Sequence, residues 1–152
     1  MTVRFACVTE IEAAPEVVFD LSLDIDAHVR SMAGSGERAI GGVTSGTIGL
    51  HEEVTWAAHH LGIPFVMTSR ITELDRPRRF VDVQVHGPFH TFRHEHRFEA
   101  TGGGTRMVDA IRFDAPLGVL GRTVERLVLA TYLRRLIAKR NDYLKKAAEA
   151  AA

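Results

Sequence analysis

Two histidines and an aspartate on neighbouring segments have the types and the spacing to do chemistry together. His94 and His96 are one residue apart, so on a β-strand both side chains point to the same face. A glycine turn at 102–103 would fold the next segment back and place Asp109 opposite His96. A carboxylate beside an imidazole fixes its tautomer and raises its pKa, which suits acid–base catalysis. His94, His96 and Asp109 are therefore the candidate catalytic residues.

The residues around these three are apolar. The same register predicts four facing pairs: Phe98–Met107, His96–Asp109, His94–Ile111 and Phe92–Phe113. Buried polar groups cost free energy unless they are paired or hydrated. This face therefore either lines a cavity that holds water and a ligand, or belongs to a hydrogen-bonded core.

The two histidines could also bind a metal ion. Imidazoles at i and i+2 on a strand occur in zinc and iron sites, and Asp109 could be a third ligand or could orient a histidine. The spacing supplies no firm third ligand. We therefore expect no metal and no other cofactor, and a histidine–aspartate hydrogen-bond network is the simpler interpretation.

The composition is that of an ordinary globular protein. The chain has 152 residues, of which 45% are hydrophobic and 25% charged, so we expect one domain spanning 1–152. The 19 basic and 19 acidic residues cancel, which gives no support to nucleic-acid binding. The C-terminal segment is locally basic. We interpret this as a solvated helix face, and binding to an acidic membrane surface is a weaker hypothesis.

Cysteine usage and hydropathy bear on the compartment. Cys7 is the only cysteine, which excludes an internal disulfide, and we expect a buried, inert thiol. The N-terminus does not resemble a signal peptide, and no apolar run approaches the ~18 residues that a membrane helix needs. We therefore expect a cytoplasmic protein without an integral membrane segment.

Hydrophobic periodicity predicts an antiparallel sheet and three helices. We expect strands at 3–12, near 38–40, at 47–60, 65–74 and 80–86, and on both sides of the turn at 102–103. Pro15 would open a first short helix, and Asp24 would cap a second. An apolar stripe predicts a long helix from about 119 to 148. The last five strands follow one another through short turns and should form a meander.

The strand at 80–86 has an ambiguous pattern. One of its faces carries Val81, Val83 and Val85, and the other carries Phe80, Asp82 and Gln84. We favour the arrangement in which Phe80 faces the core, because Asp82 and Gln84 then join the polar wall near His94. The valines would form an apolar strip on the outer face, which suits a homodimer contact. His51, His59 and His60 show no convergent partner and receive no role.

Three motifs carry a resemblance to a known family. They are Ala14-Pro15-Glu16-Val17-Val18-Phe19, the stretch from Gly87-Pro88-Phe89 to His94-Glu95-His96-Arg97-Phe98, and Gly103-Gly104-Thr105-Arg106-Met107-Val108-Asp109 followed by Pro116-Leu117-Gly118. With the order of elements, they resemble the SRPBCC or START-like superfamily, which includes birch-pollen-allergen-like and polyketide-cyclase-like proteins. The resemblance implies an α+β helix-grip fold: a curved antiparallel sheet of about seven strands wrapped around a long C-terminal helix, with two short helices after the first strand.

The resemblance also implies a cavity between sheet and helix. The first functional hypothesis is a protein that binds a small hydrophobic ligand there, such as an aromatic, polyketide, quinone or lipid-like molecule. The alternative is a cyclase or dehydratase that uses the histidine–aspartate group as acid and base. The residues expected to contact the ligand are Trp56, Phe65, Met67, Asp82, Gln84, Phe92, His94, His96, Phe98, Met107, Asp109, Ile111, Phe113, Val128 and Tyr132.

Overall fold

The computed structural model describes residues 2–115 and 122–152. In chain order the elements are β1 (Val3–Ile11), α1 (Pro15–Ser22), α2 (Ile25–Ser31), the 3₁₀ turn η1 (Ala33–Ser35), β2 (Arg38–Gly42), β3 (Glu53–His60), β4 (Ile63–Asp75), β5 (Arg79–His86), β6 (Thr91–Thr101), β7 (Gly104–Asp114) and α3 (Arg122–Ala151). The predicted α+β helix-grip fold is confirmed. The expected helix start at 119 lies outside the described residues, and the described helix extends to Ala151.

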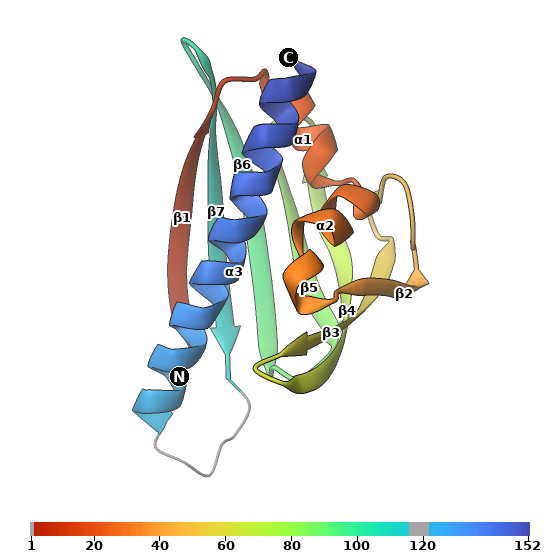
Figure 1. The fold of residues 1–152 in the computed structure, drawn as a ribbon, viewed down its shortest axis with the longest axis vertical. Coiled ribbons are helices and arrows are strands. Elements are labelled where there is room, and N and C mark those ends of the chain that lie inside the picture. The colour runs from red at the N-terminus through yellow and green to blue at the C-terminus, as the bar shows by residue number, and fades with distance from the viewer. Residues whose placement is uncertain (1, 116–121) are drawn as a thin grey trace.

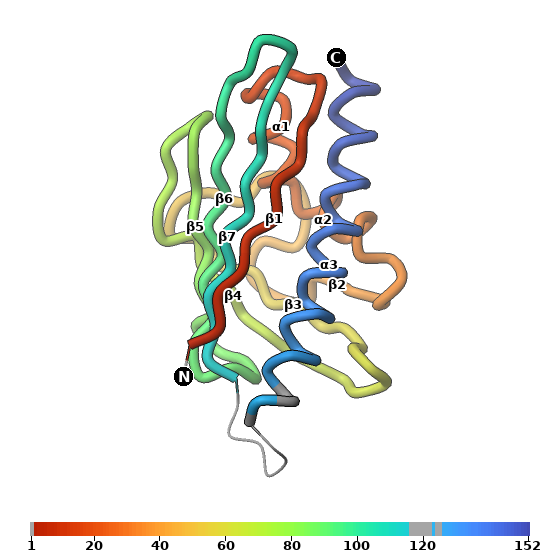
Figure 2. The backbone as a smooth tube through the Cα atoms, turned by 90° about the vertical axis from the view of Figure 1, so that its left-hand side faces the viewer, coloured from red at the N-terminus to blue at the C-terminus, as the bar shows by residue number. Residues whose placement is uncertain are grey.

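All strands form one antiparallel sheet in the order β1-β7-β6-β5-β4-β3-β2. Strands β3 to β7 form the expected meander, and β1 closes against β7. The sheet curves, and all three helices lie on its concave side (Figures 1 and 2). None of the described helices has the length and hydropathy needed to cross a membrane.

The β6–β7 hairpin has the predicted register. Phe92 faces Phe113, His94 faces Ile111, His96 faces Asp109 and Phe98 faces Met107. Thr101 pairs with Gly104, so Gly102 and Gly103 form the turn. Gly104 has its own requirement, because a Cβ atom there would lie 2.1 Å from the carbonyl oxygen of Ile11. The turn therefore positions Asp109 and both histidines as the sequence indicates.

The helices fill the two ends of the concave face. Near its upper end in Figure 1, Phe19 of α1 packs edge-on against Phe80 and Phe98, with ring centroids 5.6 and 5.3 Å apart. Along the β1–β7 edge, the row Leu129, Leu133 and Ile137 of α3 packs on a cluster that contains Phe5, Phe92, Ile111 and Phe113. Tight packing at these places leaves the middle of strands β3 to β6 as the part of the face that can border a cavity.

The strand expected at 47–60 is shorter than predicted and begins at Glu53. The preceding residues turn back to the helices instead: Ile48 N–H donates to the carbonyl of Leu23 at 3.1 Å, and His51 has a positive φ of 69°. Ile48 is therefore buried, whereas Leu50 is exposed. Gly46, with a φ of 71°, permits this bend, and hydrophobic alternation alone does not reveal it.

The expected apolar strip on the outer face of β5 is wrong. Val81 is fully buried, and Val83 and Val85 are half-buried. Val81 pairs with Glu73 and Glu95, and these carboxylates are bridged by arginines 79 and 93 at 3.1 to 3.3 Å. The aliphatic stems of such a network cover apolar surface, so the argument for a homodimer contact at this strip is lost.

Cys7 is half-buried rather than buried. It packs against the cluster under α3, and burial raises the pKa of its thiol, with a further contribution from Asp109. A raised pKa disfavours the nucleophilic thiolate, which agrees with the expected inertness.

Candidate functional site

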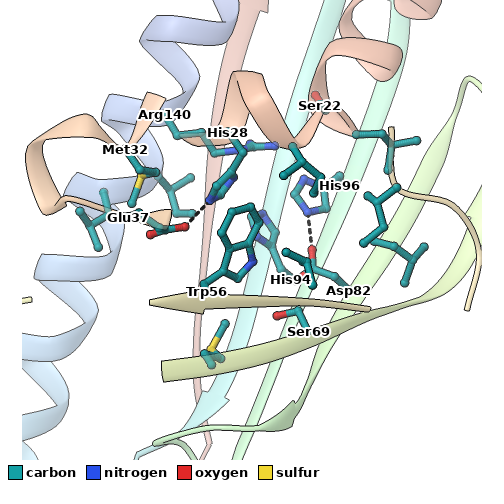
Figure 3. A pocket seen from close by; sticks show the side chains of 18 of the residues that line it. Ser22, His28, Met32, Glu37, Trp56, Ser69, Asp82, His94, His96 and Arg140 are labelled. Carbon is teal, nitrogen blue, oxygen red and sulfur yellow. Dashed lines mark hydrogen bonds and ion pairs between the residues drawn. The ribbon is translucent and has the colours of Figure 1, made fainter. Parts of the chain in front are cut away.

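A cavity lies between the concave face of the sheet and α3, in two adjoining compartments of about 180 and 200 Å³. Both are lined by Glu37, Trp56, His60, Met67, Phe92, Leu133 and Leu136, so they form one continuous site. The polar compartment reaches α2, the middle of α3 and the paired histidines (Figure 3). The apolar compartment lies between β3, β4, the β5–β6 connection and α3, and its further lining residues are Ala58, Phe65, Pro88, Phe89, Leu129 and Tyr132.

The wall of the polar compartment is built on the carboxylate of Asp109, which has no exposed surface. His94 Nε2 donates to its Oδ1 at 2.7 Å, and Arg140 Nη1 donates to the same oxygen at 3.3 Å. Asn141 Nδ2 donates to Oδ2 at 2.7 Å. Asp109 therefore links β6, β7 and α3 and has no free oxygen for a ligand.

His96 lies between two carboxylates. Its Nε2 donates to Asp82 Oδ2 at 2.8 Å. Its Nδ1 is 3.2 Å from Asp109 Oδ1 but lacks hydrogen-bond geometry, and it is a buried atom without a partner among the described residues. Asp82 lines the cavity and its side chain is 19% exposed. Of the two carboxylates beside His96, Asp82 is therefore the one that can touch a ligand; the sequence predicted contact for both and chose Asp109 as the catalytic candidate.

The pKa shifts in the wall indicate that the His94 imidazole is neutral and that the two carboxylates are charged. Burial, followed by the proximity of His96, lowers the pKa of His94 to about 4, so this ring is neutral at pH 7. Burial alone would raise the pKa of Asp109, but hydrogen bonding from His94, the nearby His96 and the charge of Arg140 hold it well below its usual range. The pKa of Asp82 is also lowered, because the hydrogen bond from His96 and nearby positive charge outweigh burial. Asp82 and Asp109 are therefore ionised at neutral pH.

The histidine pair is poorly arranged for a metal ion. Asp82, His94 and His96 offer ligand atoms within 4.8 Å of one another. However, the two imidazoles are stacked, with centroids 3.7 Å apart and planes inclined by 23°. A metal ion bound by both imidazoles must lie near the plane of each ring, ~2 Å from its nitrogen. The planes of two stacked rings intersect only far from the nitrogens, so no single position satisfies both histidines. Chelation would require one ring to rotate away from its carboxylate.

Four polar residues of this wall and cavity were not predicted from the sequence. On α3, Arg140 and Asn141 bind Asp109, although they continue the apolar rows at i+4 from Leu136 and Ile137, a spacing that marked them as inward-facing. On α2, His28 Nε2 donates to the buried Glu37, and its ring lies 4.4 Å from that of Trp56. No periodic signal indicated this contact between α2 and the segment before β2.

The fourth unpredicted residue is His60, which receives no role from the sequence pattern. Its Nδ1 is 2.8 Å from the hydroxyl of Tyr132, and it lines both compartments. Burial lowers the pKa of His60, and burial raises that of Tyr132. Both groups are therefore uncharged at neutral pH, and they offer hydrogen bonds within the more apolar part of the cavity.

The structure brings about half of the predicted ligand residues to the cavity. Those that line it are Trp56, Phe65, Met67, Asp82, Phe92, His94, His96 and Tyr132. The others lie elsewhere: Phe98 and Met107 in the core under α1, Ile111 and Phe113 under α3, Asp109 behind the histidines, and Val128 on the exposed side of α3. Gln84 binds the main chain of Phe89 through both amide atoms. The predicted residues of β7 do not reach the cavity because α3 packs directly over this strand.

A test of the wall follows from the lowered pKa of His94. Between pH 6.5 and 4, His94 is protonated in the unfolded chain and remains neutral in the folded chain. Acidification through this range should therefore lower the free energy of unfolding. The contribution of His94 is about 3 kcal/mol over the full range. We expect His94→Gln, which keeps a donor but does not titrate, to have a smaller slope of stability against pH. Urea unfolding monitored by Trp56 fluorescence would measure it.

The control is His90→Gln, which changes an exposed histidine and should retain the wild-type slope. The lowered pKa of His60 adds to the slope in all three proteins, so the difference between them isolates His94. An unchanged slope in His94→Gln would contradict the assigned electrostatics.

Comparison with known proteins places the chain in a family. The model of the family described as polyketide cyclase / dehydrase and lipid transport matches residues 2–149. A comparison with curated proteins finds no match.

Several solved structures share the fold. The protein TTHA0849 from Thermus thermophilus superposes with a TM-score of 0.78 at 19% identity, covering 100% of this chain and 99% of that one. The Zhui aromatase/cyclase from Streptomyces sp. R1128 has a TM-score of 0.80 at 15% identity, covering 98% and 94%. Major latex-like protein 151 from Panax ginseng has a TM-score of 0.71 at 14% identity, covering 97% of both chains. These likenesses establish the fold, and the family match across nearly the whole chain shows that this protein belongs to the polyketide cyclase / dehydrase and lipid transport family.

Proposed function

We propose that this protein binds a small hydrophobic molecule in the cavity between its sheet and α3. The observation that carries the proposal is the pairing of an apolar compartment with a polar one in a continuous space. Together the compartments fall within the ~300–1,000 Å³ typical of ligand sites, which are mostly apolar with a few polar groups that fix orientation. An aromatic, polyketide, quinone or lipid-like ligand has this distribution of polarity.

The lining residues assign each compartment a part in binding. The apolar compartment offers Phe65, Phe89 and Leu129, whose contact with a ligand would remove apolar surface from water at about 25 cal/mol per Å². The polar compartment offers Ser69, whose hydroxyl can donate to a ligand carbonyl, and the ionised Asp82, which can accept from a ligand hydroxyl or amine. Trp56 borders both compartments and can contact a flat ligand along its length.

Filling the apolar compartment should weaken binding. Ala58 lines this compartment, so Ala58→Phe would place a ring where the ligand lies. We expect the affinity for a fluorescent hydrophobic probe such as phenylnaphthylamine to fall by at least about tenfold, because a buried ring excludes an equal volume of ligand. Fluorescence titration measures this loss.

The matched control is Ala57→Phe, one residue away on the opposite face of β3. This variant should bind the probe as the unsubstituted protein does. Equal affinity in Ala58→Phe and Ala57→Phe would place the probe outside the cavity and remove the proposal.

A second candidate function is acid–base catalysis of the cyclase or dehydratase type. The specific observation in its favour is the Asp82–His96 hydrogen bond at the cavity wall, beside the family match. Asp82 is ionised and faces the cavity, so it could remove a proton next to a ligand carbonyl while His96 positions it and shares its charge. Asp109 would then hold the wall in place from behind, and His94 would border the substrate without taking part in the proton transfer.

Exchange of α-protons tests catalysis without knowledge of the substrate. An enzyme of this type should accelerate deuterium incorporation into a hydrophobic ketone such as phenylbutanone, followed by NMR in D₂O. His96→Ala should lower that rate by about two to four orders of magnitude while ketone binding stays within a few-fold. If the ketone binds but its α-protons exchange no faster than in buffer, the catalytic function is contradicted and ligand binding alone is supported.

A further inference from the structure

We propose that the polar compartment selects a ligand with a protonated amine, which binds Asp82 and Ser69 while the apolar part of the ligand occupies the adjoining compartment. The inference deepens the proposed ligand-binding function and rests on it. It follows from the charge of the cavity lining, from two acceptors without donors and from the aromatic wall beside them.

The charged lining of the cavity is predominantly acidic. The carboxylates that line it are Asp24, Glu37 and Asp82, and Asp109 lies directly behind the wall. Among the described residues, Arg140 is the cationic side chain other than histidine that lines either compartment. Its Nη1 is already bound to Asp109 and to Asn141 Oδ1 at 3.0 Å. The cavity therefore presents no uncompensated positive charge to an anion.

The histidines do not reverse this balance. The lowered pKa values of His60 and His94 leave both rings neutral at pH 7. The remaining rings, His28 and His96, each bind a carboxylate. Even with both of these protonated, they and Arg140 supply three positive charges against the four carboxylates. A ligand carboxylate would be repelled by this lining, and an ammonium group would be attracted.

Two acceptors in the polar compartment lack donors. His96 occupies Asp82 Oδ2, and no described residue donates to Oδ1 of the same carboxylate. Ser69 is 5% exposed, lines the compartment, and its hydroxyl has no hydrogen-bond partner among the described residues. Ser69 on β4 is the diagonal neighbour of Asp82 on β5, and Figure 3 shows the two side chains next to each other. Among the described residues, His96 Nδ1 is the fully buried side-chain atom without a hydrogen-bond partner, so the Ser69 hydroxyl keeps access to the cavity, where a ligand can complete its hydrogen bonding.

The surroundings of these acceptors fit the rest of such a ligand. Trp56 stands between Glu37 on one side and Asp82 on the other (Figure 3). An ammonium group at Asp82 would lie close to the indole, and its apolar substituent could pass Trp56 and Met67, which border both compartments. Hydrogen bonds from a cation to a carboxylate are about twice as strong as neutral ones, so Asp82 would provide most of the selectivity.

Three matched probes test the inference: phenylbutylamine, phenylbutanol and phenylbutyrate, titrated calorimetrically into the whole protein at pH 7. They differ in the head group alone. We expect the amine to bind at least about tenfold more tightly than the carboxylate, with the alcohol between them, because charge-assisted hydrogen bonds add selectivity of this size. A carboxylate that binds as tightly as the amine would overturn the inference.

Variants locate the selectivity. Asp82→Asn should weaken amine binding by about tenfold and change alcohol binding by less than about threefold, and Ser69→Ala should weaken the amine by about threefold. Asp20→Asn is the matched control, because it removes an exposed carboxylate paired with Arg76 on the surface. It should leave all three affinities unchanged. If thermal melting shows that Asp82→Asn does not fold, the test rests on the order of the three affinities in the wild-type protein and on the loss of amine affinity in Ser69→Ala.

The outcomes separate this inference from the proposed function. Binding of the alcohol and the amine with equal affinity would keep the ligand-binding function and overturn amine selectivity. An amine preference that persists in Asp82→Asn and Ser69→Ala would also overturn it, since the charge would act elsewhere. Failure of all three probes and of phenylnaphthylamine to bind would instead overturn the proposed function itself.

Discussion

The buried carboxylate of Asp109 is the interaction on which the rest of the site depends. A charge without solvent contact is tolerated in a protein interior when hydrogen-bond donors surround it, and removal of one partner of a buried pair typically costs about 3–5 kcal/mol. Here the donors come from His94 on β6 and from Arg140 and Asn141 on α3. The need to pair this one group therefore fixes the orientation of an imidazole and the position of a helix.

The position of α3 in turn determines where the cavity lies. Because Arg140 and Asn141 must reach Asp109 on β7, the helix lies over the β1–β7 edge, and its row Leu129, Leu133 and Ile137 packs there. The middle of the sheet is left partly uncovered. The cavity consequently borders β3 to β6, and the residues of β7 that alternate toward the same face form the core under the helix instead.

Much of this arrangement could be predicted from the sequence, because local patterns determine it. The β6–β7 register follows from a two-residue glycine turn, and alternation then places His96 opposite Asp109. Strand parity also placed Phe80 and Asp82 on one face of β5, and the grouping of polar residues favoured the concave side, where both lie. Contacts between segments far apart in the chain were beyond such patterns. Nothing local distinguishes which histidine binds which carboxylate, and the neighbours predicted to pair, His96 and Asp109, lack hydrogen-bond geometry.

The central claim is that the space beside the histidine wall is the ligand site. Chemical-shift mapping of the isotope-labelled protein with phenylbutanol tests it most directly. The account predicts the largest shifts at residues that border both compartments, above all the Trp56 indole and His60, with small shifts at Val81 and Glu95 on the outer face. Shifts confined to the outer face or to exposed ends of elements, with Trp56 unmoved, would contradict the account.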